Sequence, residues 1–170
     1  NWLAVDDDRG LCPEGWHVPS DGEFMELEMY LGMSYDDAHD FGHRGTNEAG
    51  KLKATGTVQN GDGLWYWPNS CSTNESGLTV QPGGYRSHSG FNGDYHNLGL
   101  QSYLFTSTEC GNWCIYTRTL DYNECSISRD HSGRNAGKSV RCIRNDGPIS
   151  GCTDNIACNF DLNAEIEDGS

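Results

Sequence analysis

Hydrophobic spacing predicts one clear helix near the start of the chain. Phe24, Leu27 and Leu31 recur three or four residues apart, which is the spacing of one face of an α-helix. Ser20 can cap the first turn, and Glu23 stands three residues later in a capping-box pattern. We therefore expect a helix that begins just after Ser20.

The rest of the chain is typical of a second short helix followed by strands and loops. Gly32 can end the first helix in the left-handed conformation, and a shorter helix is expected over residues 34–39. Alternating apolar and polar positions then predict three strands, over residues 103–108, 113–120 and 139–143. The middle strand has apolar residues on both faces, so the pattern does not show which face is buried. The predicted fold class is α+β, with the helix early and the sheet late.

Composition and charge exclude several classes of protein. The 170 residues include 25 acidic and 11 basic residues, for a net charge of −14. Nucleic-acid binding needs clustered Lys and Arg, and a membrane helix needs about 20 consecutive apolar residues. Since the sequence has neither, we expect no nucleic-acid partner and no membrane span.

Eight cysteines indicate an oxidising compartment. Structural zinc favours CxxC pairs or alternating Cys and His, which are absent here, so disulfides are the better interpretation. The expected location is extracellular or on the cell surface. The cysteines are Cys12, Cys71, Cys110, Cys114, Cys125, Cys142, Cys152 and Cys158.

A shift in composition divides the chain near residue 147. Residues 151–170 hold five acidic residues and no Lys or Arg, whereas the preceding 150 residues hold 20 acids against 11 bases. We expect a main domain over residues 1–146 and a short acidic module over residues 147–170. Because the chain starts with Asn1 and not with Met, we expect a piece of a longer or processed protein.

Six motifs resemble one family of bacterial domains. They are Cys12–Asp21, Gly50–Gly56, Thr73–Leu78, Pro82–Arg86, Thr106–Glu109 and Ser139–Ile143. In this order, over about residues 1–145, they closely resemble the Fibrobacter succinogenes major paralogous domain. The resemblance implies a secreted or surface-displayed, disulfide-bonded domain with a C-type-lectin-like fold, similar also to formylglycine-generating enzymes. Such a fold has an early helix, short antiparallel strands and long loops.

The resemblance also implies a disulfide between Cys12 and Cys142, since lectin-like folds close with a terminal clasp. In the chain-entropy model, a bond that closes a loop of about 130 residues contributes roughly 4–5 kcal/mol. A redox site at Cys110 and Cys114, as in an oxidase, is the functional alternative to structural bridging, which we favour. Four cysteines can pair in three ways that the sequence leaves open: Cys71, Cys110, Cys114 and Cys125.

The last twenty residues resemble a short repeat of large secreted proteins from marine bacteria. In that repeat a third cysteine follows Asp-Gly-Ser, so the pairing of Cys152 and Cys158 stays open. Alternating oxygen donors there resemble the front of a calcium loop, although the glycine and the bidentate glutamate of an EF-hand are missing. Calcium is therefore the expected cofactor, with a solvated acidic linker as the alternative. The candidate ligands are Asp154, Asn159, Asp161, Asn163, Glu165 and Asp168.

Trp65, Tyr66 and Trp67 are the candidate ligand-binding residues. Exposed aromatic rings stack on the apolar faces of sugars, whereas most large aromatic side chains anchor the core. Three consecutive side chains on a strand cannot all face inward. We expect Tyr66 to be exposed and the two tryptophans to point to the core.

Two further candidate sites are expected to be structural. Asn74 begins an Asn-Glu-Ser glycosylation sequon, but it lies within the Thr73–Leu78 motif, so a turn is the favoured interpretation. His39 and His43 are four residues apart and could bind a metal from one helix face. No third ligand is evident, so surface histidines are preferred.

These observations predict a binding or adhesion module of a larger extracellular protein, which recognises a glycan or protein ligand on a surface. The alternative is a structural subunit or decoration of a filament or surface layer, in contact with copies of itself. We expect no enzyme, because nucleophile-elbow, phosphate-loop, dinucleotide and zinc-protease motifs are absent. A formylglycine-generating-type oxidase is the least favoured alternative.

Overall fold

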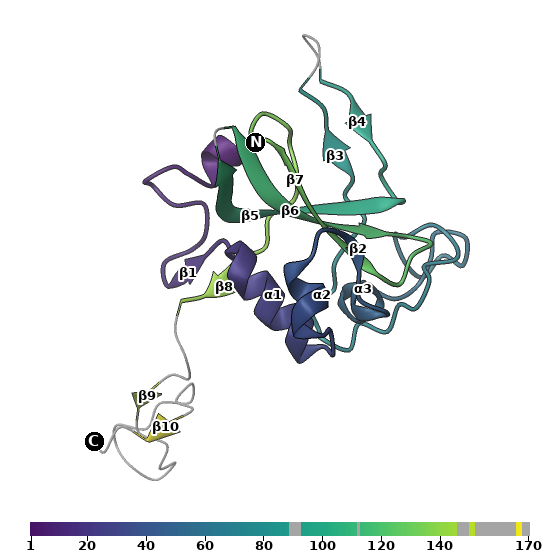
Figure 1. The fold of residues 1–170 in the computed structure, drawn as a ribbon. Coiled ribbons are helices and arrows are strands. Elements are labelled where there is room, and N and C mark those ends of the chain that lie inside the picture. The colour runs from purple at the N-terminus through teal and green to yellow at the C-terminus, as the bar shows by residue number, and fades with distance from the viewer. Residues whose placement is uncertain (89–92, 112, 146–149, 152–165, 168–170) are drawn as a thin grey trace.

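The computed structural model describes residues 1–88, 93–111, 113–145, 150–151 and 166–167, and Figure 1 shows their arrangement. Four antiparallel strands form the main sheet, in the order β2-β7-β6-β5. Their bounds are β2 Gly42–Arg44, β5 Gln101–Gly111, β6 Cys114–Asp121 and β7 Ile127–Gly133. The predicted α+β class, with few helices, antiparallel strands and disulfides, is confirmed.

Within the described residues, four short helices accompany the sheet: η1 Trp2–Ala4, α1 Asp21–Tyr30, α2 Tyr35–His39 and α3 Glu48–Leu52. Helix α1 begins as predicted. The Ser20 hydroxyl accepts a hydrogen bond from the Glu23 N–H at 3.2 Å, and the Glu23 carboxylate accepts one from the Ser20 N–H at 2.8 Å. Gly32 follows with φ +114°, which confirms the predicted end.

Helix α3 was not predicted, because it is short and carries a glycine in its middle. A Cβ on Gly50 would collide with the backbone of Cys71, so the close approach of the two segments requires glycine there. Helix α2 confirms the second prediction, with Ser34 as its N-cap.

The part of the chain that the structure describes also contains three small two-stranded pairs: β1 Trp16–His17 with β8 Ile143–Arg144, β3 Tyr85–Arg86 with β4 Tyr95–His96, and β9 Ser150–Gly151 with β10 Ile166–Glu167. The β1–β8 pair joins the two ends of the main domain. The Cys12–Cys142 disulfide lies beside it, with Cα atoms 5.8 Å apart, as the resemblance implied.

Two further disulfides resolve the pairing that the sequence left open. Cys71 is bonded to Cys125 and Cys110 to Cys114, with Cα atoms 5.5 and 5.3 Å apart. All six cysteines of the described residues are thus in disulfides. Cys152 and Cys158 lie outside the described residues.

The predicted strands agree with the structure in two of three cases. Residues 103–108 lie within β5, and residues 113–120 correspond to β6. The prediction for 139–143 is wrong: Ser139 makes only an isolated bridge, and Ile143 belongs to β8. The third long strand is β7, whose sequence is mostly polar.

Strand β6 is buried on both faces, which explains its ambiguous pattern. Ile115 and Thr117 are buried on one face, and Arg118 and Leu120 on the other. Leu120 belongs to the larger apolar cluster, and Ile115 to a smaller one. The sheet is therefore covered from both sides.

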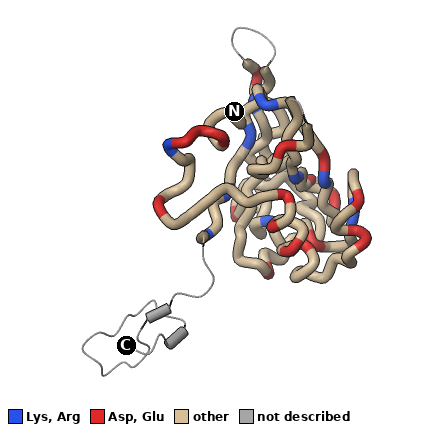
Figure 2. Tube along the Cα trace, turned by 60° about the vertical axis from the view of Figure 1, so that its left-hand side comes forward, with Lys and Arg blue, Asp and Glu red and all other residues tan. Residues whose placement is uncertain are grey.

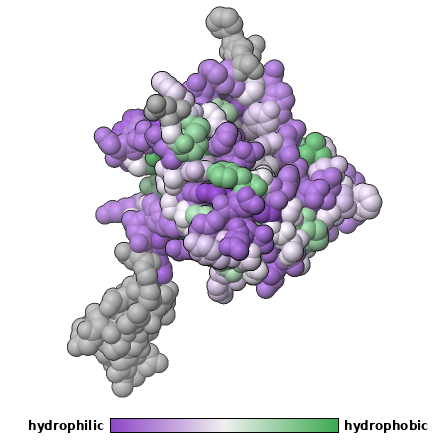
Figure 3. Space-filling view, in the orientation of Figure 1, coloured by the Kyte–Doolittle hydropathy of each residue, from purple (hydrophilic) through white to green (hydrophobic). Residues whose placement is uncertain are grey.

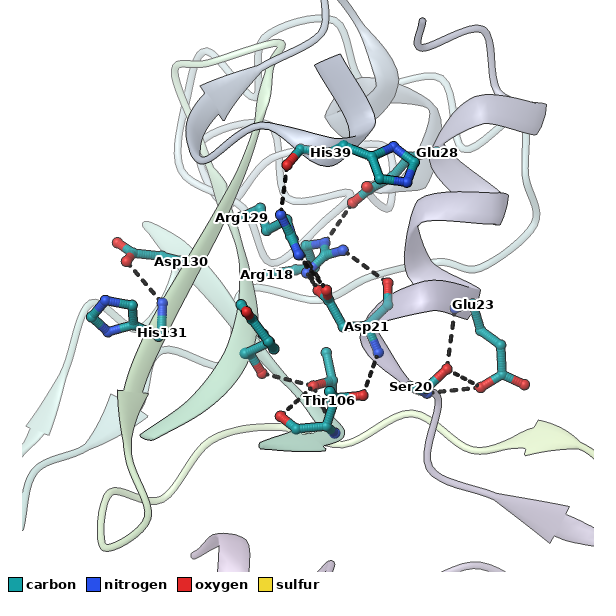
Figure 4. Close-up of polar contacts among 12 residues, drawn as sticks. Ser20, Asp21, Glu23, Glu28, His39, Thr106, Arg118, Arg129, Asp130 and His131 are labelled. Carbon is teal, nitrogen blue, oxygen red and sulfur yellow. Dashed lines mark hydrogen bonds and ion pairs between the residues drawn. The ribbon is translucent and has the colours of Figure 1, made fainter. Parts of the chain in front are cut away.

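A buried network of charges joins α1 to the sheet (Figure 4). Its members are Asp21 and Glu28 from α1, Arg44 from β2, Arg118 from β6 and Arg129 from β7. Arg118 donates to Asp21 and to Glu28, at 2.6 Å each. Arg129 donates to Asp21 at 2.6 Å and to the carbonyl of His39 at 2.9 Å. Helix α1 is thus fixed to the sheet by ion pairs as well as by apolar packing.

These partners change the ionisation of the network. Burial alone would raise the pKa of Asp21, but the hydrogen bonds from Arg129 and Arg118 outweigh it, so this pKa is lowered. For Arg44, burial lowers the pKa, and this effect outweighs the attraction of Glu28, which raises it. Asp21 is therefore a buried carboxylate that stays ionised because it is paired.

Candidate functional site

A mostly apolar groove of about 290 Å³ lies among the loops between α3 and β5. We call it the Tyr66 groove. It is lined by Val58, Leu64, Tyr66, Gln81, Pro82, Gly83, Leu98 and Gly99. Leu64 and Leu98 are mostly exposed at its rim, and Figure 3 shows hydrophobic residues on the side of the molecule where these loops lie. Apolar side chains grouped at the surface in this way are typical of a binding site.

Backbone hydrogen bonds hold the main chain of Tyr66 beside this groove. The Tyr66 N–H donates to the Gly99 carbonyl at 2.8 Å, and the Tyr66 carbonyl accepts from the Asn69 N–H at 3.1 Å. Gly99 has φ +80°, and a Cβ there would lie 3.1 Å from the Tyr66 ring. Glycine at position 99 therefore leaves room for the ring, which is 40% exposed.

The prediction for the three consecutive aromatic residues is right for two of them. Trp65 is fully buried and donates its indole N–H to the Val80 carbonyl at 3.0 Å, and Tyr66 is exposed. Trp67 is 67% exposed, so its predicted burial is wrong. The three residues lie in an irregular segment outside any strand, where the inward and outward alternation of a strand does not apply. Tyr66 and Trp67 are thus two neighbouring exposed aromatic residues.

A more polar hollow of about 470 Å³ adjoins the Tyr66 groove. Its lining residues are Ala54, Thr55, Gly61, Asp62, Gly63, Leu64, Asn74, Thr79 and Gln81. Leu64 and Gln81 line both spaces, and Gln81 also lines a third hollow of about 180 Å³. Gln81 therefore lies where an apolar surface meets a polar one.

Local hydrogen bonds hold the walls of the polar hollow in place. The Asn74 side chain accepts from the Thr79 N–H at 2.8 Å and donates to the Thr79 hydroxyl at 3.0 Å. Asn74 has φ +53°, so it occupies the predicted turn. Asp62 accepts from the Thr57 N–H at 2.7 Å. The hollow is thus formed by turns that are ordered by their own side chains.

Lys53 stabilises the region behind the groove. It is fully buried, and its Nζ donates to the carbonyls of Asp121 and Glu124 at 2.9 Å each. The ammonium lies 5.4 Å from the centroid of the buried Trp65 ring. Burial lowers the pKa of Lys53 to about 8. This lysine ties the chain after β6 to the aromatic segment that carries Tyr66.

The two candidate histidines lie on different elements. His39 ends α2, where its Nδ1 is 2.8 Å from the Tyr35 carbonyl oxygen and its ring stacks on Tyr35. His43 is exposed on β2, so the two do not share a helix face. Within the described part of the chain, no three His, Cys, Asp or Glu side chains are grouped to hold a metal ion. The six candidate calcium ligands, between positions 154 and 168, lie outside it.

Sequence reasoning identified Tyr66 but missed the rest of the groove. Gln81, Leu98 and Gly99 come from segments 15 or more residues away, and only the fold brings them to Tyr66. The Pro82–Arg86 motif was one available signal, since it includes two of the residues that line the groove. Figure 2 shows acidic residues spread over the surrounding chain, with Lys and Arg among them.

Comparison with known proteins gives one match. The family model for the Fibrobacter succinogenes major domain matches residues 1–144. No curated protein and no solved structure matches the chain. None of the helices in the described residues has the length and apolar character needed to cross a membrane.

Proposed function

The chain belongs to the Fibrobacter succinogenes major domain family, and from that premise we propose that it is an extracellular module that binds a glycan in the Tyr66 groove. One observation carries this proposal: an apolar groove lined by the half-exposed Tyr66 meets a polar hollow at Gln81. A pyranose ring has the same two-sided character, with C–H groups on its faces and hydroxyls around its edge. An amphipathic ligand of this kind suits the groove better than a purely apolar one.

Each part of the groove has a role in binding. The Tyr66 ring stacks on one face of a sugar, and the leucines at the rim cover further C–H groups. The amide of Gln81 and the carboxylate of Asp62 hydrogen-bond with hydroxyls. Because hydrogen bonds already order the turns, binding costs less conformational entropy than it would with a mobile loop.

The scaffold supports an extracellular role. Three disulfides in the described residues are typical of proteins from oxidising compartments. We propose a C-type-lectin-like arrangement, in which loops on a domain closed by a disulfide recognise the ligand and no reaction is catalysed. In this proposal the short acidic module over residues 147–170 binds calcium and links the domain to its neighbours.

A glycan array with and without added calcium tests the proposal. Tyr66→Ala should lower the affinity for every bound glycan at least tenfold, because the stacking surface is lost. Tyr30→Ala is the matched control, since Tyr30 is 86% exposed on α1, away from the groove. The proposal fails if Tyr66→Ala and Tyr30→Ala bind every glycan as the wild type does.

A further inference from the structure

A second exposed aromatic side chain lies at the end of the β5–β6 hairpin. Trp113 is 78% exposed and has φ +78°, a left-handed conformation that a bulky residue seldom adopts. The Cys110–Cys114 disulfide joins the two strands on either side of it. The hairpin is therefore covalently closed just below an exposed indole ring.

A stack of side chains supports this ring from the core outward. Trp2 is buried and donates its indole N–H to the Thr106 carbonyl at 2.9 Å. The Arg134 guanidinium carbon lies 4.9 Å from the Trp2 ring centroid and 5.9 Å from that of Trp113. Glu109 holds Arg134 in place at 2.6 Å. The Arg134 guanidinium is thus within cation–π distance of both the buried and the exposed indole.

We propose that Trp113 is a second carbohydrate-stacking platform, which makes the domain bivalent for glycans. This inference rests on the glycan binding proposed for the Tyr66 groove. The exposed indole offers a flat apolar surface for the C–H face of a sugar ring. Arg134, whose guanidinium lies near this ring, and Glu109, its ion-pair partner, carry groups that hydrogen-bond with hydroxyls. Charged neighbours of this kind suit a sugar better than the apolar core of a protein interface.

The two sites lie at opposite ends of one strand. Leu98 and Gly99 of the Tyr66 groove precede β5, and Trp113 follows it. The 11 residues of β5 span at most roughly 35 Å. Figure 1 shows the end of the β5–β6 hairpin beside the N-terminus, with the loops between α3 and β3 on the other side of the molecule. The two sites can therefore hold two different glycan chains and bridge them.

Two measurements on the full chain test the proposal, with hexasaccharides of β-1,4-linked glucose and of β-1,4-linked N-acetylglucosamine as probes. Calorimetry gives the number of free hexasaccharides bound per chain, and light scattering follows the clumping of beads that carry the same sugar. The wild type should bind two hexasaccharides and clump the beads. Trp113→Ala should bind one and clump none, with at least a tenfold loss of apparent affinity for the beads. Trp113→Phe, which keeps an aromatic ring, should restore clumping, and Tyr30→Ala should behave as the wild type.

The outcomes separate the two proposed sites. The bivalent proposal is overturned if Trp113→Ala still binds two hexasaccharides, or if Tyr66→Ala alone removes all binding. In the second case the Tyr66 groove stands as the single site. If Trp113→Ala removes all binding and Tyr66→Ala removes none, Trp113 is the single glycan site and the groove proposal fails. A wild type that binds neither probe contradicts the bivalent proposal for these sugars, while the glycan array still tests the groove.

Discussion

Replacement of Glu28 by glutamine tests the buried charge network that fixes α1 to the sheet. The Glu28 carboxylate is fully buried, with one oxygen 2.6 Å from Arg118 Nε and the other 2.7 Å from Arg44 Nη2. Glutamine keeps the shape of the side chain but removes the negative charge, and its amide nitrogen cannot accept from an arginine. Arg118 and Arg129 then share the carboxylate of Asp21, and Arg44 loses its ion pair.

The expected loss is large because the change leaves buried positive charge without a partner. Removal of one partner from a buried ion pair costs about 3–5 kcal/mol. The matched control is Glu26→Gln, on the exposed side of the same helix, which should change stability by less than about 0.5 kcal/mol. The free energy of unfolding is measured by urea titration with the disulfides intact, because urea does not screen charges as guanidinium chloride does. A loss below about 1 kcal/mol for Glu28→Gln, or an equal loss in both variants, would refute the reasoning.

Three further predictions follow from the structure. Gly99→Ala should weaken glycan binding at least fivefold by crowding the tyrosine ring of the groove, whereas Gly15→Ala, outside the groove and the hollow, with φ +78° and no atom within 4 Å of its Cβ position, should leave it unchanged in the same calorimetric titration. Loss of the Cys12–Cys142 disulfide, which spans 130 residues, should lower the free energy of unfolding by about 4–5 kcal/mol in urea, and an unchanged urea midpoint would contradict this. The pKa of Asp21 is lowered in the folded state, so its contribution to stability is present above its ordinary value of 3.8 and is lost as the pH falls through the folded value. Stability measured from pH 5 to pH 2 should therefore fall, and Asp21→Asn should flatten the fall.

Local signals in the sequence were enough to predict the first helix. A cap at Ser20, a reciprocal Glu23 and a glycine at position 32 act within one segment, so no knowledge of the fold was needed. The charge network gave no such signal. Asp21 and Glu28 are 90 or more residues away from Arg118, and a charged residue on a helix is usually solvated.

Strand β7 was missed for a related reason. Its buried residues include two polar ones, Ser128 and Arg129, and Arg129 pairs with Asp21, 108 residues away, so the strand lacks the apolar alternation that identifies most strands. In the groove, the sequence correctly predicted that Tyr66 is exposed but wrongly predicted that Trp67 is buried. The expectation assumed a strand, and no strand forms over residues 65–67.

Nuclear magnetic resonance titration of the wild type with a glycan selected on the array tests the central claim most directly. We predict progressive shifts of the backbone amides of Leu64, Tyr66 and Gly99 and of the side-chain amide of Gln81, all of which belong to the groove. Saturating glycan that leaves these four signals unmoved, while signals elsewhere in the domain shift, would contradict it.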